Sequence, residues 1–193
     1  MSISNLFRLD GRTAFVTGAS SGLGVVFAEA LAAAGANVAL AARRKDKLRE
    51  VEARIQSNGG NAVSVACDVS DPAQVEAAVE QACNRFGRID ILVNNAGIAV
   101  DGGAVPESLP NELFEQTIRV NLMGTWYCCR EVGRRMLAEG GGSIINVASI
   151  AGMSGVADFP VAYQSSKAAV INLTTGRRQG SPPRRTCPLW TRH

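Results

Sequence analysis

The sequence has a single histidine, His193, at the end of its 193 residues. A Ser-His-Asp hydrolase and a metal centre built from histidine ligands are therefore excluded, because neither has the imidazoles that it requires. We predict no metal site. Acid–base chemistry near neutral pH must then use a tyrosine, lysine, cysteine or carboxylate whose pKa the protein shifts.

The chain also lacks long apolar runs and paired cysteines. No run approaches the roughly 18 apolar residues of a membrane span, and the first ten residues lack the features of a secretory signal. The five cysteines (67, 83, 128, 129 and 187) include no Cys-x-x-Cys pair, which is typical of reduced thiols rather than of a disulfide or zinc framework. With 46% hydrophobic and 19% charged residues, the sequence predicts a soluble, cytoplasmic protein with no membrane partner.

Acidic residues are absent from residues 176–193, which hold five arginines and three of the seven prolines. Without those arginines the chain has 15 basic and 17 acidic residues, a net charge of −2, so residues 1–175 show no footprint for nucleic acid. We expect one domain over residues 1–175 and a basic, Pro/Arg-rich, disordered tail over 176–193. The tail is either an interaction arm or the product of out-of-frame translation of a GC-rich gene, and we favour the second interpretation.

Short apolar, β-branched runs alternate with helical patterns along residues 13–175. We expect strands at residues 13–17, 37–41, 62–67, 91–93 and 143–148. Asp71 and Pro72 look like the N-cap and first residue of one helix. A long helix from about Asn111 carries an apolar stripe on Phe114, Ile118, Leu122 and Trp126, and a last helix spans about 161–175. This alternation predicts an α/β fold with a doubly wound, Rossmann-like parallel sheet, whose ligands bind at the carboxyl ends of the strands.

A glycine-rich turn follows the first expected strand and leads into a helix. Its glycines are spaced Gly-x-x-x-Gly-x-Gly, so that backbone N–H groups can approach a pyrophosphate at a helix N-terminus. A tight connection without a ligand is the alternative. We predict that the turn binds a dinucleotide through Gly18, Ser20, Ser21, Gly22, Leu23 and Gly24.

The second expected strand is followed by Arg43 and Arg44 and by no acidic residue. A carboxylate there would bind a ribose 2′-hydroxyl, whereas an arginine accommodates a 2′-phosphate. Cations at the start of a helix are unfavourable unless an anion is present. The pattern favours NADP(H) over NAD(H), with Arg43 and Ser20 on the phosphate and Arg44 as a further candidate. A solvated basic helix start is the alternative.

Polar residues also follow the third and fourth strands. Asp68, followed by Val69, could accept a hydrogen bond from the adenine amino group or cap the next turn. Asn95, Ala96 and Gly97 end the fourth strand; asparagine readily adopts left-handed turns, but this position at the carboxyl end also favours cofactor contact.

Tyr163 and Lys167 are four residues apart on the last expected helix, so they share one face. A nearby ammonium favours the phenolate and lowers the pKa of a tyrosine. Ser149 lies just past the fifth strand, where it either starts a turn or donates to a substrate carbonyl.

These motifs together resemble the short-chain dehydrogenase/reductase family, in its simple oxidoreductase branch, over about residues 8–175. The resemblance implies hydride transfer between NADP(H) or NAD(H) and a carbonyl or alcohol substrate. Tyr163 would exchange a proton with the substrate oxygen, and Lys167 would lower the tyrosine pKa and hold the nicotinamide ribose. Ser149 would orient the substrate oxygen. Asn121, from a locally disturbed helix, would hold a water that links Lys167 to solvent.

The sequence departs from the family after about Thr175. Family members continue with two more strands and a substrate loop, so we expect a sheet without those strands, an apolar open edge on strand 143–148 and the loss of most substrate determinants. Members also form homo-oligomers through the long helix and the Tyr-Lys helix, but here part of the packing that supports these helices is missing. A catalytically silent NADP-binding protein or a non-functional truncated product are therefore the alternatives to an active oxidoreductase.

Overall fold

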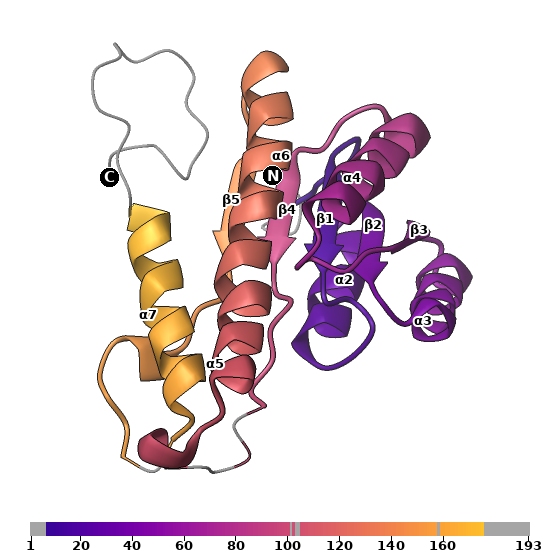
Figure 1. The fold of residues 1–193 in the computed structure, drawn as a ribbon. Coiled ribbons are helices and arrows are strands. Elements are labelled where there is room, and N and C mark those ends of the chain that lie inside the picture. The colour runs from indigo at the N-terminus through magenta and orange to yellow at the C-terminus, as the bar shows by residue number, and fades with distance from the viewer. Residues whose placement is uncertain (1–6, 101, 103–104, 158, 176–193) are drawn as a thin grey trace.

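The computed structural model describes residues 7–100, 102, 105–157 and 159–175 (Figure 1). The predicted tail, residues 176–193, lies outside the described residues. The strands are β1 (Thr13–Thr17), β2 (Asn37–Ala42), β3 (Asn61–Ala66), β4 (Ile91–Asn94) and β5 (Ser143–Asn146). The helices are α2 (Leu23–Ala33), α3 (Lys45–Ser57), α4 (Pro72–Phe86), α5 (Asn111–Ile118), α6 (Gly124–Ala138) and α7 (Val161–Thr175). Short 3-10 turns, η1 (Pro106–Ser108) and η3 (Ile150–Gly152), and one π turn, η2 (Arg119–Met123), complete the set.

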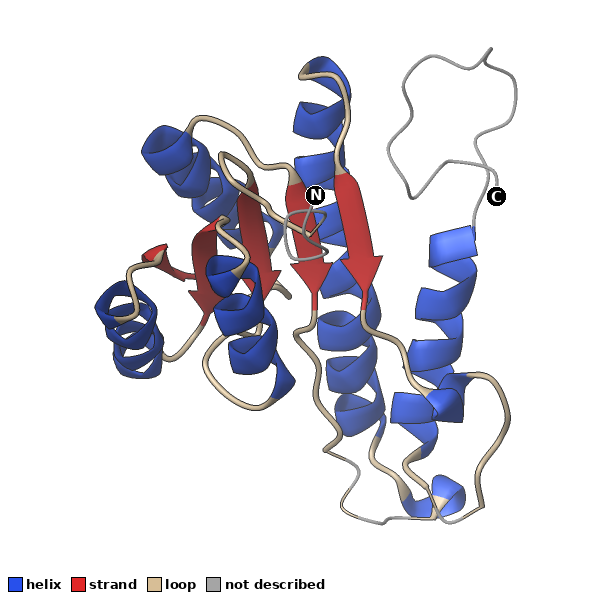
Figure 2. Cartoon of the chain, turned by 180° about the vertical axis from the view of Figure 1, so that it is seen from behind, coloured by secondary structure: helices blue, strands red, loops and turns tan. Residues whose placement is uncertain are grey.

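These five strands are parallel and lie in the order β3-β2-β1-β4-β5. The chain runs outward from β1 to β3 and then crosses to the other side of β1 for β4 and β5. Figure 2 shows helices on both faces of the sheet. The predicted doubly wound, Rossmann-like fold is confirmed, and the reversal of strand order forms a crevice for ligands at the carboxyl ends of β1 and β4.

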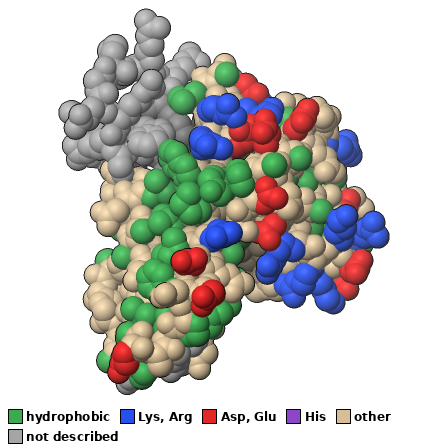
Figure 3. Space-filling view, viewed as in Figure 1, with side chains coloured by type: hydrophobic (Ala, Val, Ile, Leu, Met, Phe, Trp, Pro, Cys, Tyr) green, Lys and Arg blue, Asp and Glu red, His purple; other side chains and the backbone are tan. Residues whose placement is uncertain are grey.

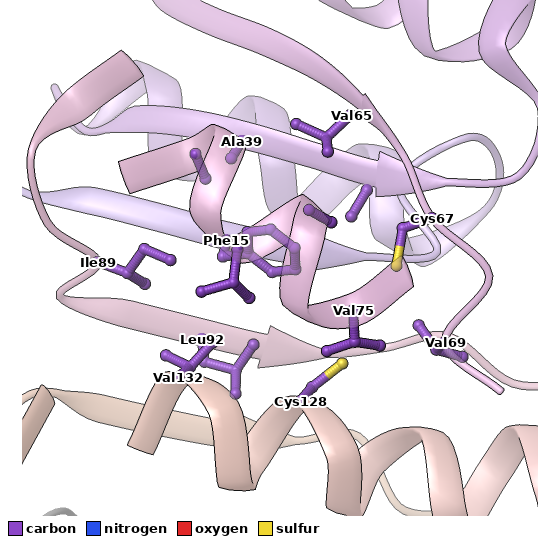
Figure 4. Packing of buried hydrophobic residues seen from close by; sticks show 14 of the residues in the cluster. Phe15, Ala39, Val65, Cys67, Val69, Val75, Ile89, Leu92, Cys128 and Val132 are labelled. Atoms are coloured by element: carbon purple, nitrogen blue, oxygen red, sulfur yellow. The ribbon is translucent and has the colours of Figure 1, made fainter. Parts of the chain in front are cut away.

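Alternate residues of the strands pack against the two helical layers. In β1, Phe15 belongs to the core that α4 and α6 cover (Figure 4), whereas Ala14 and Val16 belong to the core on the side of α2 and α3. All three side chains are fully buried. Burial on both faces requires strands that are apolar throughout. Such short apolar runs are the pattern from which these strands were predicted.

Helix α4 begins at the predicted residue. Its N-cap is Asp71, whose Oδ1 accepts hydrogen bonds from the backbone N–H groups of Ala73 at 2.9 Å and Gln74 at 3.3 Å. Pro72 occupies the first helical position, where no N–H is needed. The Gln74 side chain and these two amides hold the pKa of the Asp71 carboxyl below its usual value. Local sequence thus determines where the loop after β3 ends.

The predicted long helix is interrupted by η2, which separates α5 from α6. The predicted apolar stripe on Phe114, Ile118, Leu122 and Trp126 is only half-buried. The buried face lies one residue earlier along most of the stripe, on Thr117, Asn121, Thr125, Cys128, Val132 and Met136. The apolar stripe is therefore not the fully buried face, which carries the polar residues Thr117, Asn121 and Thr125 around η2 and the apolar residues Cys128, Val132 and Met136 farther along α6.

Strand β5 ends at Asn146, before the predicted end at residue 148. Within the described residues it pairs only with β4, and Ile145 is 49% exposed. The apolar open edge expected on this strand is therefore present in that part of the chain. None of the helices in the same part has the length and apolar character needed to cross a membrane.

Candidate active site

The loops that follow the first four strands surround a cavity of about 420 Å³. Parallel strands end at the same edge of a sheet, so loops far apart in sequence meet there. The cavity is lined by many of the predicted cofactor-binding residues: Gly18, Ser20, Ser21, Leu23, Arg43, Arg44, Asp68, Val69, Asn95, Ala96 and Gly97. Sequence reasoning missed the other lining residues, Ala42, Cys67, Ile98 and Val120. All four adjoin a predicted site residue in sequence, but no pattern in the sequence singles them out.

Glycines allow the loop between β1 and α2 to turn tightly. Gly18 has a φ of 66° and Gly22 a φ of 58°, which side-chain-bearing residues rarely adopt. A Cβ on Gly24 would lie 2.6 Å from Asn95 Nδ2 and would also clash with the Gly18 carbonyl oxygen. The turn is a cradle that a larger side chain would fill. It leads into the N-terminus of α2, where free N–H groups favour an anion.

Two arginines and two serines form one wall of the cavity. Arg44 Nη2 donates to Ser20 Oγ at 3.0 Å and to Ser21 Oγ at 2.6 Å. Arg43 is exposed on the same wall. The structure thus brings Arg44, the further candidate for the 2′-phosphate site, onto the glycine-rich turn. Guanidinium and hydroxyl groups are a donor set suited to a phosphate.

Thr17 joins the ends of β1 and β4. Its Oγ1 accepts hydrogen bonds from the backbone N–H groups of Asn95 at 3.0 Å and Ala96 at 3.1 Å, and donates to the Val93 carbonyl at 3.3 Å. The Asn95 side chain in turn donates to the Thr17 carbonyl at 3.1 Å. The sequence placed Thr17 at the end of the first expected strand and gave it no role. Its position directly before Gly18 was the only signal available.

Asp68 caps the turn after β3, as one of its two interpretations predicted. Its Oδ1 accepts from the Ser70 N–H at 2.9 Å and the Ser70 hydroxyl at 2.7 Å. Contact with adenine stays a prediction, although Asp68 also lines the cavity. Val69 packs on Gly124, where an added Cβ would lie 2.7 Å from Val69 Cγ2, so the start of α6 supports this wall.

Tyr163 and Lys167 share one face of α7, as predicted. Lys167 Nζ lies 5.6 Å from the centroid of the Tyr163 ring. Lys167 is only 4% exposed, and burial lowers its pKa. Its Nζ donates to the Val147 carbonyl at 2.6 Å, which uses one of the three N–H groups of an ammonium. The pair therefore places a buried cationic group beside a half-buried phenol.

Asn121 lies in η2, which is the helix disturbance that the resemblance implied. Its Oδ1 accepts from the Ile98 N–H at 2.8 Å, and its Nδ2 donates to the Ile98 carbonyl at 2.9 Å and to Ser166 Oγ at 3.0 Å. The side chain therefore ties the segment after β4 to α7. The water relay assigned to Asn121 stays a prediction.

Gly97 connects the cavity to these residues. It lines the cavity, and a Cβ on it would lie 3.4 Å from Asn121 Oδ1 and 3.6 Å from Lys167 Nζ.

Ser149 caps η3, where its Oγ accepts from the Ala151 N–H at 3.2 Å. Starting a turn is one of the two roles predicted for Ser149. The chain just before Ser149 is joined to α7 through the Lys167–Val147 hydrogen bond.

Three of the described thiols, those of Cys67, Cys83 and Cys128, are unsuited to acid–base chemistry near neutral pH. Burial, followed by the charges of Asp68 and Asp71, raises the pKa of Cys67 to about 12. Burial likewise raises the pKa of Cys83 and Cys128. Across the part of the chain that the structure describes, no group of three or more His, Cys, Asp and Glu side chains is placed to hold a metal ion. Lys167, beside Gly97, and its neighbour Tyr163 are the candidate groups for such chemistry.

Comparison with known proteins agrees with this geometry. A family model described as short chain dehydrogenase matches residues 12–185. D-threitol dehydrogenase of Mycolicibacterium smegmatis is 41% identical over 174 residues, which cover 90% of this chain and 66% of that protein. The chain therefore spans slightly less than two thirds of this relative's length.

Solved structures show the same likeness. The crystal structure of a short-chain type dehydrogenase/reductase from Mycobacterium marinum has a TM-score of 0.86 at 40% identity, with coverage of 91% of this chain and 71% of that one. A gluconate 5-dehydrogenase from Burkholderia cenocepacia J2315, in complex with NADP and tartrate, has a TM-score of 0.84 at 36% identity, with coverage of 90% and 67%. The chain belongs to the short chain dehydrogenase family.

Proposed function

We propose that the chain binds NADP(H) and transfers a hydride between this cofactor and a small-molecule carbonyl or secondary alcohol, with Tyr163 as acid and base. NAD(H) is the alternative cofactor. The observation that carries the proposal is the cavity of about 420 Å³ at the strand ends, whose wall residue Gly97 lies against Lys167 and Asn121. Nucleotide-binding and proton-transfer groups thus adjoin each other.

The cavity suits a dinucleotide phosphate. The cradle at Gly18 and Gly24 has no room for a Cβ, so backbone N–H groups can approach a pyrophosphate closely. Arg43 and Arg44 would hold a 2′-phosphate together with Ser20. Asp68 engages Ser70 through Oδ1, and its Oδ2 is the atom we propose for the adenine amino group. The NADP complex of the similar gluconate 5-dehydrogenase supports this cofactor.

When bound, the nicotinamide ring supplies or accepts the hydride. The Tyr163 hydroxyl gives a proton to the substrate carbonyl oxygen in reduction and takes the alcohol proton in oxidation. Lys167 Nζ lies 5.6 Å from the centroid of the Tyr163 ring, and its remaining N–H groups would hold the nicotinamide ribose. Ser149 accepts a hydrogen bond from Ala151, which leaves its own proton for the substrate oxygen. Asn121 would hold the water that links Lys167 to solvent.

The substitution Tyr163→Phe tests the proton donor. We expect it to abolish turnover over a panel of ketones and secondary alcohols, while the Kd for NADPH in a fluorescence titration stays nearly unchanged. The matched control is Tyr127→Phe, at the chain's other tyrosine, on α6. Turnover that survives in Tyr163→Phe would show that the donor is wrong. Wild-type protein that binds NADPH without turnover would favour the silent binding protein, and the absence of a cooperative thermal transition would indicate a non-functional product.

The partners follow from the same reasoning. We propose a small-molecule substrate, with no nucleic acid or membrane as partner, and a cytoplasmic location in keeping with the reduced thiols of Cys67, Cys83 and Cys128. Apolar side chains gather over the outer surface of α6 in Figure 3, and Leu137 of this helix is 42% exposed. This surface is where we expect a second copy of the chain in a homo-oligomer.

A further inference from the structure

The residue after Tyr163 holds the loop that precedes α7. Gln164 Oε1 accepts from the Val156 N–H at 2.7 Å. Gln164 Nε2 donates to the Val156 carbonyl at 3.1 Å and to the Phe159 carbonyl at 2.8 Å. A glutamine amide has one acceptor oxygen and two N–H donors, and here all of them engage the backbone of this loop.

A second contact holds the same loop at its beginning. A Cβ on Gly152 would lie 2.6 Å from both the Lys167 carbonyl carbon and the Ala168 backbone nitrogen. Only a glycine allows η3 to approach the backbone of α7 so closely. The described residues 152–157 and 159 are therefore held by α7 near both ends of this loop.

This segment brings an aromatic ring to the candidate proton donor. The rings of Phe159 and Tyr163 meet edge to face, with centroids 5.8 Å apart and planes at 66°. Phe159 is 42% exposed, so its ring presents apolar surface to solvent beside the phenol. Met153 and Val156, at 79% and 41% exposure, add further apolar surface to the same segment.

We propose that Gln164 is a positioning residue that holds Phe159 as an apolar wall beside Tyr163, and that this wall selects carbonyl substrates with an apolar group next to the reacting carbon. The selectivity rests on the proposed function, in which Tyr163 is the proton donor. The positioning role rests on geometry alone, because it follows from three hydrogen bonds and a ring contact.

The test compares two probe ketones in the NADPH-dependent direction: acetophenone, whose phenyl group is apolar, and dihydroxyacetone, which is polar. We expect Gln164→Met to lower the ratio of kcat/KM for acetophenone to that for dihydroxyacetone by about tenfold, the scale of a lost apolar contact in a substrate pocket. Phe159→Ala should lower the ratio similarly. Gln164→Glu keeps the acceptor for the Val156 N–H but sets a carboxylate oxygen against the Val156 and Phe159 carbonyls, so it should lower the ratio at least as much as Gln164→Met. The Kd for NADPH should not change in any of these variants.

The matched control is Asn172→Ala, which also removes a carboxamide from α7. The Asn172 side chain donates to the Ala168 carbonyl at 3.2 Å, so its hydrogen bond stays within the helix and does not reach the loop. It should leave the ratio unchanged. A Gln164→Met variant with the wild-type ratio would overturn the selectivity. Hydrogen exchange at the Val156 amide decides the positioning role separately: faster exchange in Gln164→Met than in Asn172→Ala supports it, and equal exchange refutes it. Wild-type protein that turns over neither ketone would refute the proposed function, while the exchange result would still decide the role of Gln164.

Discussion

The hydroxyl of Thr17 offers the sharpest test of how the cavity is held together. Thr17 is 1% exposed, and its Oγ1 is the acceptor for the backbone N–H groups of Asn95 and Ala96. The substitution Thr17→Val keeps the shape of the side chain and replaces the hydroxyl by a methyl group. Both amides then lose their acceptor in a partly buried place.

The expected cost follows from those two amides. A buried donor without a partner costs about 1–3 kcal/mol. Because both amides are only partly buried, we expect a total of roughly 2–4 kcal/mol. With a urea m-value of about 2 kcal/mol/M, the unfolding midpoint should fall by about 1–2 M. Affinity for NADPH should fall as well, because Asn95 and Ala96 line the cavity.

Thr117→Val is the matched control. Thr117 is fully buried too, but its hydroxyl donates only to the Leu113 carbonyl one turn earlier, at 3.0 Å. Its loss leaves no backbone N–H without a partner, so we expect a change below about 1 kcal/mol. Urea denaturation followed by circular dichroism measures both variants. Equal midpoints for the two would refute the reasoning that Thr17 holds the ends of β1 and β4 together.

Other consequences follow from single residues. Gly24→Ala should weaken NADPH binding at least tenfold, because its Cβ would clash with the Gly18 carbonyl oxygen, whereas Gly155→Ala, with open space around it, should have no effect in the same titration. Arg43→Asp should weaken NADPH binding and favour NADH; an unchanged preference would remove the argument for a 2′-phosphate site. Burial lowers the pKa of Lys167, so the charged form of this side chain destabilises the folded state. The destabilisation is relieved as the pH rises from the lowered pKa toward the ordinary lysine value near 10, because the buried amine then loses its proton. The stability of the wild type relative to Lys167→Met, measured by urea denaturation, should therefore increase as the pH rises toward about 10, and a constant difference would contradict the burial argument.

Much of the architecture could be predicted because it is encoded locally. The cap at Asp71 and the apolar strands depend on residues close together in sequence; the cap appears at the predicted residue, and the strands lie at their predicted places with ends that differ by up to two residues. The glycine-rich turn is likewise readable, since Gly18 and Gly22 take conformations that favour glycine. The order of strands and helices then suffices for the parallel sheet and for the edge at which the site lies.

The inward face of the helices around η2 was not predictable in this way. Hydrophobic size pointed to Phe114 and Ile118, whereas the structure buries Thr117 and Asn121. The buried face is chosen by what lies opposite it, and Asn121 is buried because the Ile98 backbone supplies its hydrogen-bond partners.

The sequence by itself determined the fold and the types of groups at the strand ends, because periodicity, capping and glycine turns act over a few neighbouring residues. Only the tertiary structure decided which of those groups meet. Arg44 reaches Ser20 across 24 positions of sequence, and Thr17 meets Asn95 across 78. Such contacts depend on how strands and loops are placed in space, and no local pattern records that placement.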